Sequence, residues 1–539
     1  MMSGATQQQI QAALRGNDMR RAAQLAEDAL ARGESHETLY CLAAMARQEL
    51  GDNHGAAAFY FRAAELAPQN PAILAGAADA LRSAGRLREA VRLFDDAIAL
   101  DPSSLAAWYG RAMALESESA FEEALASFQR VTELAPNSAA GFAGLAGLQI
   151  RMGDLTAAES NGQKAYALGP NENGTLLALA RIAFAAGDYK QAASWTERML
   201  ASSGLPQENE IIAATLLGDA LGKLGQVSNA YQAYERANRR FSMLHEGPDP
   251  KPIVRNQVET IASDLQAIDP LRFLGQTGSV PHEAKGHIFL LGYPRSGTTL
   301  AEQILSTLPD IVSLEEAPTF AHLAEYLEPS GLAKLLSLDD RELTSLRARY
   351  WASVAALGAD VAGKTFVDMD PLKGAALPLI AKLFPDAKIV VMHRDPRDVV
   401  WSCFRHSFVY SPAACEFSSL ERAARHFAAV MTVIRLSLSR LKMDAHVLSY
   451  EELVRHFDAA TRELCDFLGV AWSTDMRAFD RIAMDRRVRT ASADQVRQTL
   501  FDGSGQWNAY SEFIDPVVHH LAPWIDPASL KSQVAYSTD

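Results

Sequence analysis

The chain has little cysteine and no recognisable set of metal ligands. It contains four cysteines in 539 residues, none of them in a Cys-x-x-Cys pair, and its histidines do not cluster at metal-ligand spacing. Structural metal sites and disulfide-stapled folds depend on such clusters. We therefore expect neither a zinc site nor a disulfide framework.

Long apolar runs are also missing. No stretch of about 18 apolar residues occurs, which is the length that a membrane-spanning helix requires. The first twenty residues are polar and lack the apolar segment of a secretion signal. Together with the scarce cysteines, these absences predict a soluble protein of the cytoplasm.

Positive charge is in deficit. Lysine and arginine total 51 against 65 aspartates and glutamates, so the net charge is −14. Nucleic acids and acidic membranes select basic surfaces, so neither is an expected partner, although a local basic pocket stays compatible. The remaining composition, 48% apolar and 22% charged, is that of a globular protein, and the length predicts three or four domain-sized units.

A pattern with a period of 34 residues runs through the first half. Its proline column is Pro68, Pro102, Pro136 and Pro170. Its alanine column is Ala56, Ala90, Ala124 and Ala158. Its aromatic column is Tyr60, Phe94 and Phe128, with Gly162 in the fourth place. Its turn column is Gly51, Gly85, Gly153 and Gly187, with Ser119 where one glycine is missing. Small residues let helices approach, glycine permits a tight turn and proline ends a helix, so each period predicts two paired helices.

This period and pattern resemble the tetratricopeptide repeat. About seven helix pairs fit over residues 5–244, and we assign residues 1–246 to an all-α solenoid. Stacked repeats of this kind present a concave face. We expect that face to bind a protein or peptide; the alternative is a scaffold that only supports the rest of the chain.

The pattern changes after the solenoid. Three prolines in residues 248–252 cannot be helical, and we assign 247–285 to a linker with a connecting helix. Beyond it, short apolar runs at 287–291, 388–392 and 444–448 alternate with helical stretches. Buried strands alternating with helices predict an α/β domain over 286–539, with a parallel sheet that binds ligands at the carboxyl ends of its strands.

The first apolar run leads into a glycine-rich loop, Gly292-Tyr293-Pro294-Arg295-Ser296-Gly297-Thr298-Thr299. This is the spacing of a phosphate-binding loop, whose backbone N–H groups cradle an anion. The usual lysine is missing, because Thr298 stands in its place, and Arg295 is the basic residue instead. A single 5′-phosphate therefore fits better than a magnesium-bound triphosphate. A small-molecule kinase is the weaker interpretation, and an ordinary strand-to-helix turn is the interpretation without function.

The second apolar run ends in His393-Arg394-Asp395-Pro396, and Ser402 follows two helical turns later. Alone, this arrangement is equally consistent with a plain structural turn. Together with the loop, it resembles the sulfotransferases, over residues 285–525. The nearest branch is that of the tyrosylprotein sulfotransferases and of bacterial proteins that join such a domain to tetratricopeptide repeats.

The resemblance implies that 3′-phosphoadenosine 5′-phosphosulfate is the donor. It assigns the 5′-phosphosulfate to a loop made of Pro294, Arg295, Ser296, Gly297, Thr298 and Thr299. It assigns the 3′-phosphate to Arg394 and Ser402.

Further site residues follow from the same resemblance. Glu316, in Leu314-Glu315-Glu316, matches the catalytic base, which takes the proton of the acceptor hydroxyl. Tyr450 matches a tyrosine near the nucleotide, and Ser492 matches a serine that helps hold the transferring group. The segment Gly505-Gln506-Trp507-Asn508 resembles a late tryptophan loop near the 3′-phosphate.

One family residue is absent. The family places a lysine in an Asn-Lys-Asp-Pro or Asp-Lys-Met-Pro motif, where it stabilises the leaving phosphate oxygen, and Met369 occupies that position here. Losing one such charge costs on the order of 10²–10³ in rate, by analogy with oxyanion donors. Lys373 is the nearest replacement. His406 and its neighbour Arg405 stand loosely where some members keep a basic residue.

These features predict a sulfotransferase that moves a sulfuryl group in line to an acceptor hydroxyl without a metal, while the repeats dock the acceptor or a partner. The acceptor stays open between a peptide tyrosine, a glycan hydroxyl and a small phenol, and so does the oligomeric state. The competing interpretation is a repeat-based interaction scaffold whose nucleotide-binding domain is degenerate, with weak activity or none. Met369 is the feature that favours it.

Overall fold

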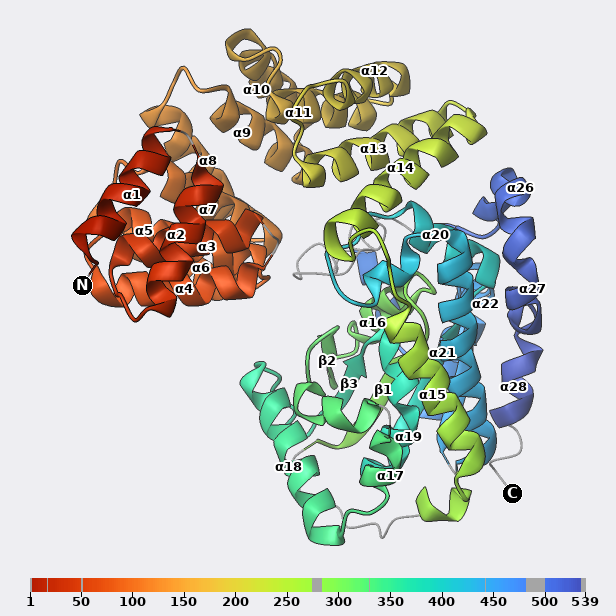
Figure 1. Cartoon of the computed structure of the whole chain (residues 1–539). Coiled ribbons are helices and arrows are strands. Elements are labelled where there is room, and N and C mark those ends of the chain that lie inside the picture. Colours follow the sequence, from red (N-terminus) through yellow and green to blue (C-terminus); the bar gives the residue numbers. More distant parts are fainter. Residues whose placement is uncertain are drawn as a thin grey trace. The chain divides into compact units, whose positions relative to one another are not determined.

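A computed structural model describes residues 2–16, 18–49, 52–273, 284–328, 330–441, 443–480 and 500–534. Contacts divide the chain into two compact units, Met1–Gln226 and Val227–Asp539. The first runs from red to yellow in Figure 1, and the second from yellow-green to blue. Within the described residues, no helix combines the length and the apolarity that crossing a membrane requires.

Every regular element in the described part of the first unit is a helix. In chain order these helices are α1 (Gly4–Arg15), α2 (Met19–Ala31), α3 (Glu37–Glu49), α4 (Asn53–Leu66), α5 (Pro71–Ser83), α6 (Leu87–Leu100), α7 (Leu105–Ser117), α8 (Phe121–Leu134), α9 (Ala139–Arg151), α10 (Leu155–Leu168), α11 (Asn173–Ala185), α12 (Tyr189–Leu200) and α13 (Gln207–Lys223). Consecutive helices pack against one another, and α4, α6, α8 and α10 each end just before a proline of the 34-residue column. The predicted helical-repeat solenoid is therefore confirmed.

The turn column of the repeat is defined by its backbone conformation. Gly85, Gly153 and Gly187 have φ values of 77°, 82° and 79°. Ser119, which replaces the glycine in one repeat, has a φ of 59°. Left-handed backbone costs a residue with a Cβ atom about 1–2 kcal/mol, so the helix-to-helix turn is imposed at Ser119 against the preference of serine.

A second glycine column, which the sequence analysis did not use, explains the aromatic one. A Cβ atom on Gly110 would lie 2.3 Å from Cζ of Phe94, and one on Gly144 would lie 2.4 Å from Cε1 of Phe128. Both rings are almost completely buried. Each aromatic side chain therefore fills the space that a missing side chain leaves on the next helix.

The second unit contains a five-stranded parallel sheet in the order β2-β3-β1-β4-β5. The strands are β1 (Gly286–Leu291), β2 (Ile311–Glu315), β3 (Thr365–Met369), β4 (Lys388–His393) and β5 (Asp444–Ser449). The three predicted strands are confirmed as β1, β4 and β5. The other two were missed because β2 is only partly buried and β3 carries polar Thr365 and Asp368, so neither forms an apolar run.

Helices surround this sheet. They are α14 (Val227–His245), α15 (Ile253–Ala267), α16 (Thr298–Leu305), α17 (Gly331–Leu335), α18 (Asp340–Ala356), α19 (Leu377–Leu383), α20 (Pro396–Arg405), α21 (Leu420–Arg440), α22 (Tyr450–Arg455), α23 (Phe457–Leu468), α26 (Ser511–Ile514), α27 (Val518–Leu521) and α28 (Ala528–Val534). The α15 helix packs along the long helix α21, as Figure 1 shows. The predicted α/β class with a parallel sheet is confirmed.

The two faces of the sheet bury different side chains. Leu290 and Met369 belong to an aliphatic core beneath α16 and α23. The alternate residues Phe289 and Phe366 join an aromatic cluster with Tyr350 of α18. Because neighbouring residues of a strand point to opposite faces, Asp368 lies on the aromatic side.

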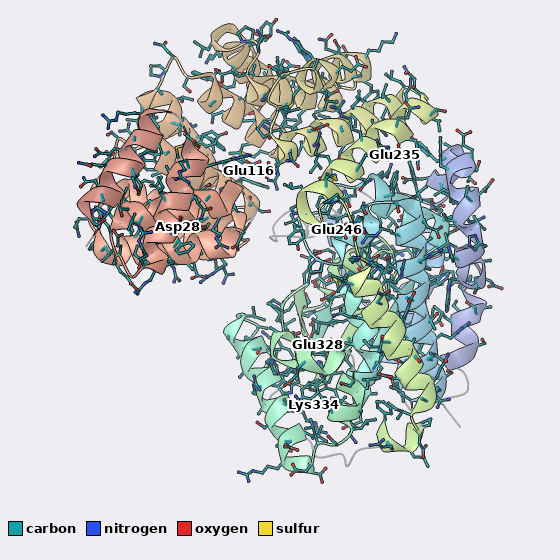
Figure 2. All side chains as sticks on the ribbon, viewed as in Figure 1. Asp28, Glu116, Glu235, Glu246, Glu328 and Lys334 are labelled. Atoms are coloured by element: carbon teal, nitrogen blue, oxygen red, sulfur yellow. The ribbon has the colours of Figure 1, made fainter. Side chains whose placement is uncertain are left out.

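The helix α14 packs within the second unit. Asn238 Nδ2 donates to the Phe404 carbonyl at 2.7 Å, and Tyr234 meets the ring of Trp401 edge-on. Beyond the end of α14, Glu246, labelled in Figure 2, accepts two hydrogen bonds from Arg422. The boundary between the two compact units therefore lies before α14. The sequence pattern instead groups this helix with the repeats, because its inner face carries the same small and aromatic residues.

Candidate active site

The glycine-rich loop joins β1 to α16. Ser296 N–H donates to the Tyr293 carbonyl at 3.0 Å, and Ser296 Oγ accepts from Tyr293 N–H at 3.3 Å. Arg295 and Gly297 have φ values of 69° and 105°. A Cβ atom on Gly297 would lie 2.9 Å from the Tyr450 ring, so only glycine fits. The loop therefore curls over the first turn of α16, an arrangement that favours anions through the N–H groups of a helix start.

Basic side chains from separate elements converge on this loop. Arg295 Nε donates to Ser402 Oγ of α20 at 3.0 Å, and Arg394, just after β4, donates to the Arg295 carbonyl at 3.0 Å. Burial lowers the pKa of Arg295 to about 10, and the charges of Arg405 and Arg394 also lower it. An acidic chain thus contains a local concentration of positive charge, at the carboxyl ends of β1 and β4.

A late loop closes around Arg394. The second terminal nitrogen of Arg394 donates to the Gly503 carbonyl at 2.7 Å, and the guanidinium lies 4.4 Å from the centre of the Tyr450 ring. Gly503 N–H in turn donates to the Tyr450 hydroxyl at 3.2 Å. The tryptophan loop is fastened nearby, because Asp398 accepts from the N–H groups of Gly505 and Trp507 at 2.6 and 3.0 Å.

Two residues with contacts in this region were not assigned from the sequence. Asp398 was missed, and Arg405 was named only as a neighbour of His406. Asp398 is almost fully buried and holds the late loop, while Arg405 donates to Gln506 at 2.7 Å. Asp398 gave no signal that distinguishes it from other acidic residues after a strand, and the signal for Arg405 was a basic residue at the end of α20. Burial beside Arg295 and Arg405 lowers the pKa of His406 to about 3, so its ring is neutral and adds no charge.

Glu316 follows the last residue of β2. Its φ is 45°, and its N–H donates to the Met369 carbonyl at 2.7 Å. Burial raises the pKa of Glu316 to about 7; Asp370 and Glu315 act in the same direction, while Arg295 and Lys373 oppose them. The side chain is nonetheless exposed to solvent, which screens part of the burial effect. The neighbouring carboxylates still leave it more basic than an ordinary glutamate.

Met369 and Lys373 differ in surroundings. Met369 is fully buried in the aliphatic core. Lys373 Nζ donates to Asp368 Oδ1 at 2.5 Å and to the Ala317 carbonyl at 3.2 Å, and only 7% of its side chain is exposed. The ammonium group lies close to the Glu316 turn, but it is already engaged there.

Comparison with known proteins gives two family matches, one in each unit of the chain. Residues 287–474 match the family model described as Sulfotransferase family. The second unit contains a sulfotransferase-family domain. Residues 76–139 match the model described as Tetratricopeptide repeat, so the chain joins both kinds of module.

Individual relatives are distant. An uncharacterized protein of Aquifex aeolicus is 26% identical over 339 residues, which are 60% of this chain and 43% of the relative. Protein-tyrosine sulfotransferase 1 of Danio rerio is 26% identical over 193 residues, 34% of this chain and 54% of the relative. The chain therefore spans about half the length of the curated relatives it matches. The crystal structure of PilW, a widely conserved type IV pilus biogenesis factor, is 24% identical with a TM-score of 0.33, over 37% of this chain and 94% of that one.

Within the sulfotransferase domain, most of the predicted site residues come together. The loop from Pro294 to Thr299 lies beside Arg394, Ser402 and Tyr450 through the contacts above. Glu316 lies close enough to Arg295 for the two charges to act on each other. Ser492 lies outside the described residues.

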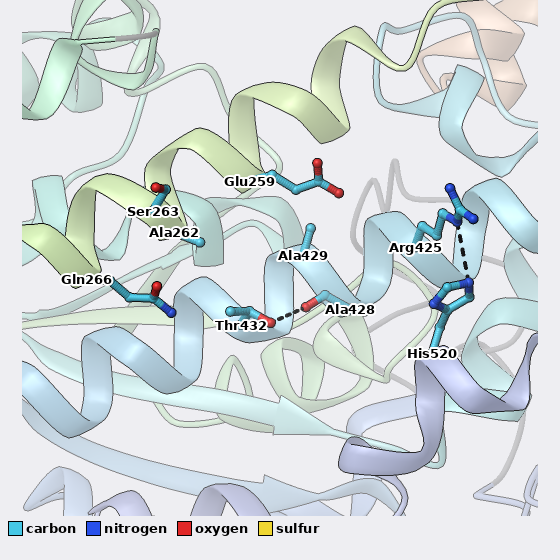
Figure 3. A pocket seen from close by; sticks show the side chains of 9 residues that line it. All are labelled: Glu259, Ala262, Ser263, Gln266, Arg425, Ala428, Ala429, Thr432 and His520. Atoms are coloured by element: carbon cyan, nitrogen blue, oxygen red, sulfur yellow. Dashed lines mark hydrogen bonds between the residues drawn. The ribbon is translucent and has the colours of Figure 1, made fainter.

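A separate pocket of about 510 Å³ opens between α15 and α21 of the sulfotransferase domain's unit (Figure 3). Glu259, Arg425 and His520 are its ionisable lining residues, and Arg425 Nε lies 3.4 Å from His520 Nε2. None of the predicted site residues lines it. The candidate active site is therefore the region around the loop and not this pocket.

Proposed function

We propose that the second unit is a sulfotransferase that moves a sulfuryl group from 3′-phosphoadenosine 5′-phosphosulfate to an acceptor hydroxyl. The observation that carries the proposal is the meeting of Arg295, Ser402 and Arg394 at the start of α16, although they lie up to 107 positions apart in sequence. The match to the sulfotransferase family supports it independently.

In this proposal, the loop from Pro294 to Thr299 binds the 5′-phosphosulfate, and Arg394 with Ser402 binds the 3′-phosphate. Buried Nε of Arg394 has no hydrogen-bond partner among the described residues. An unpaired buried donor on a cation is costly, and an anionic ligand beside it would remove that cost. Tyr450 flanks the same guanidinium and would border the nucleotide.

Glu316 is the proposed base. A new bond forms between the acceptor oxygen and sulfur, the bond from sulfur to the 5′-phosphate oxygen breaks, and the acceptor proton passes to the Glu316 carboxylate. A base works best when its pKa lies near the working pH, and the pKa of Glu316 is raised to about 7. The donor supplies the sulfuryl group, and the chain supplies the base and the cations.

The departing 5′-phosphate gains negative charge, and no lysine is available at position 369 to stabilise it. Met369 is buried in the core, and Lys373 is paired with Asp368. We assign the stabilising role to Arg295 and to the loop N–H groups. With one cation fewer, the transfer is expected to be slower by on the order of 10²–10³ than in an enzyme that keeps the lysine.

The same observation favours a second candidate function. A domain without a lysine at the leaving group suits a nucleotide-binding module with little or no turnover, attached to repeats that bind a protein. We propose for both candidates that the repeats dock a protein or peptide, as concave solenoid faces do. Nucleotide binding without transfer would select this second candidate.

Calorimetric titration with 3′-phosphoadenosine 5′-phosphate tests the proposal, with ATP as the comparison. Micromolar or tighter binding that ATP does not match supports a donor site that reads the 3′-phosphate. Equal affinity for both nucleotides contradicts the assignment of Arg394 and Ser402, and absence of binding contradicts the proposed function.

A further inference from the structure

Lys373 and Asp368 form a buried ion pair directly behind the Glu316 turn. Lys373 is 7% exposed at its side chain and Asp368 is not exposed at all. Both carboxylate oxygens of Asp368 accept hydrogen bonds, since Oδ1 accepts from Lys373 at 2.5 Å and Oδ2 accepts from Thr319 at 2.8 Å and from Tyr350 at 2.9 Å. Removing one partner from such a pair leaves a buried charge uncompensated. Lys373, Asp368 and their hydrogen-bond partners are therefore treated as one buried cluster.

This buried cluster extends into the aromatic face of the sheet. His287 Nε2 of β1 lies 2.9 Å from the Tyr350 hydroxyl, and all of these groups are buried. The Lys373 ammonium also lies 5.4 Å from the centre of the Phe320 ring. The ion pair is thus connected through hydrogen bonds to β1, β3 and α18.

The buried cluster contacts the 316–319 turn at two points. Lys373 Nζ donates to the Ala317 carbonyl at 3.2 Å, and the hydroxyl of fully buried Thr319 donates to Asp368. The Ala317 carbonyl also accepts from Thr319 N–H at 2.8 Å. Glu316 itself has a left-handed backbone, which needs support from its surroundings to persist.

We propose that Lys373 and Asp368 are positioning residues, which hold the 316–319 turn and thereby aim the Glu316 carboxylate. The inference rests on the proposed function, because it deepens the role of Glu316 as base. It also explains why Lys373 is kept close to the site while it remains unavailable to a leaving phosphate. The charged groups that face Glu316 are Asp370, Glu315, Arg295 and Lys373, and Lys373 is one of the two that favour its ionised form.

The first test measures the turn without any reaction. Hydrogen exchange followed by mass spectrometry on the full chain compares Lys373→Met with wild type. We expect peptides that contain the Glu316 and Thr319 amides to exchange roughly tenfold faster in the variant, the change expected for one lost hydrogen bond from a charged donor. Unchanged exchange over 316–319 in a folded variant would overturn the proposal.

Lys382→Met is the matched control. Lys382 is also buried, and its Nζ donates to a backbone carbonyl, that of Arg272, at 3.0 Å. Its variant should speed exchange near residues 270–273 and leave 316–319 unchanged. If Lys373→Met does not fold, Thr319→Val takes its place, because it removes one hydroxyl and keeps the ion pair. Unchanged exchange at the turn in that variant would overturn the proposal equally.

The second test measures sulfate release from 3′-phosphoadenosine 5′-phosphosulfate alone, with water as acceptor, over pH 5–9. Lys373→Met should lower this rate about 10- to 100-fold, as expected for a misplaced catalytic group, and move its acid limb to higher pH. Affinity for 3′-phosphoadenosine 5′-phosphate should stay within about twofold of wild type, since the nucleotide contacts are intact.

The two tests separate the two ideas. A wild-type protein that neither binds the nucleotide nor releases sulfate contradicts the proposed function, while the exchange result still decides whether the ion pair holds the turn. An unaltered rate and acid limb in Lys373→Met, with Glu316→Gln inactive, would refute the positioning role alone.

Discussion

Each of the two units is stabilised by its own internal contacts, and these contacts differ in the sequence separation of the residues that make them. In the first unit, the ring of Phe94 packs into the space above Gly110 on the following helix, and the same contact recurs one period later. In the second unit, Arg394 donates to the carbonyls of Arg295 and Gly503, which lie 99 and 109 positions away. A solenoid thus repeats one local solution, whereas the active site depends on the whole domain being folded.

The contrast predicts where damage will spread. A change in one repeat should weaken that repeat and its neighbours, because each repeat contacts only adjacent ones. A change in the site should alter ligand binding or chemistry with little effect on the repeats. The variants below test this separation.

The largest effect is expected for Glu316→Gln. Loss of the proposed base should lower transfer by about 10²–10⁴-fold, the usual contribution of general base catalysis, with nucleotide affinity nearly unchanged. The measurement is release of labelled sulfate from the donor, together with calorimetry. Glu325→Gln, at an exposed glutamate paired with Lys334, is the control and should behave as wild type. Retained turnover in Glu316→Gln would assign the base elsewhere.

Arg394→Ala should follow in size. It removes a cation from the proposed 3′-phosphate site and the bridge between the two loops, so binding of 3′-phosphoadenosine 5′-phosphate should weaken by about 2–4 kcal/mol. Titration calorimetry measures the change. Arg425→Ala, beside the pocket between α15 and α21, should leave the affinity unaltered. An affinity equal to wild type in Arg394→Ala would remove this residue from the site.

Gly110→Ala tests the first unit. The added Cβ atom would lie 2.3 Å from the Phe94 ring, so the free energy of unfolding of this unit should fall by about 1–3 kcal/mol. Gly174→Ala is the control, because its Cβ atom would meet its nearest atom at 3.9 Å and alanine favours the helix. Urea unfolding measures both, and nucleotide affinity should not change in either. A loss of affinity in Gly110→Ala would show that the units are coupled.

The raised pKa of Glu316 predicts a smaller effect on stability. A carboxyl group whose pKa is higher in the folded state contributes stability below its unfolded pKa of 4.5, and this contribution is lost as pH rises through about 7. Glu316→Gln should therefore be neutral at pH 4 and more stable than wild type by about 1 kcal/mol at pH 8, a value reduced for solvent screening. Thermal unfolding at both pH values measures the difference, and equal melting temperatures at pH 8 would contradict it.

The smallest effect is expected for Ser119→Gly. Glycine accepts the φ of 59° without strain, so the variant should be more stable by about 0.5 kcal/mol. Ser117→Gly, two residues earlier at the end of α7, should instead destabilise by up to about 1 kcal/mol, since glycine is a poor helix former. If both variants lose stability, the turn is not strained at Ser119.

The repeats and the loop could be predicted from the sequence, whereas the contacts between residues that the sheet brings together could not. Pro68 and its periodic counterparts mark helix ends because proline cannot continue a helix, which is a local property. The glycines at 292 and 297 mark the loop for a similar local reason. Asp398 gave no such signal, because an aspartate that holds a loop more than a hundred positions away looks like any acidic residue after a strand. Ser492 remains a prediction.

Lys373 shows the same limit in a functional residue. Its position in the chain suggests a replacement for the lysine that Met369 displaces. The tertiary structure instead pairs it with Asp368, on the face of β3 opposite to the Met369 side chain. The alternation of side chains along a strand separates two residues that are close in sequence.

The sequence by itself determined the helical solenoid, its turns, the parallel α/β class and the loop at the first strand, because each of these follows from local conformational preference and a regular hydrophobic pattern. Only the tertiary structure decided which arginines meet at that loop, which groups make Glu316 more basic, and that Lys373 is buried in an ion pair. Those outcomes depend on strand order and on burial, which bring charged residues that are distant in sequence close enough to act on one another.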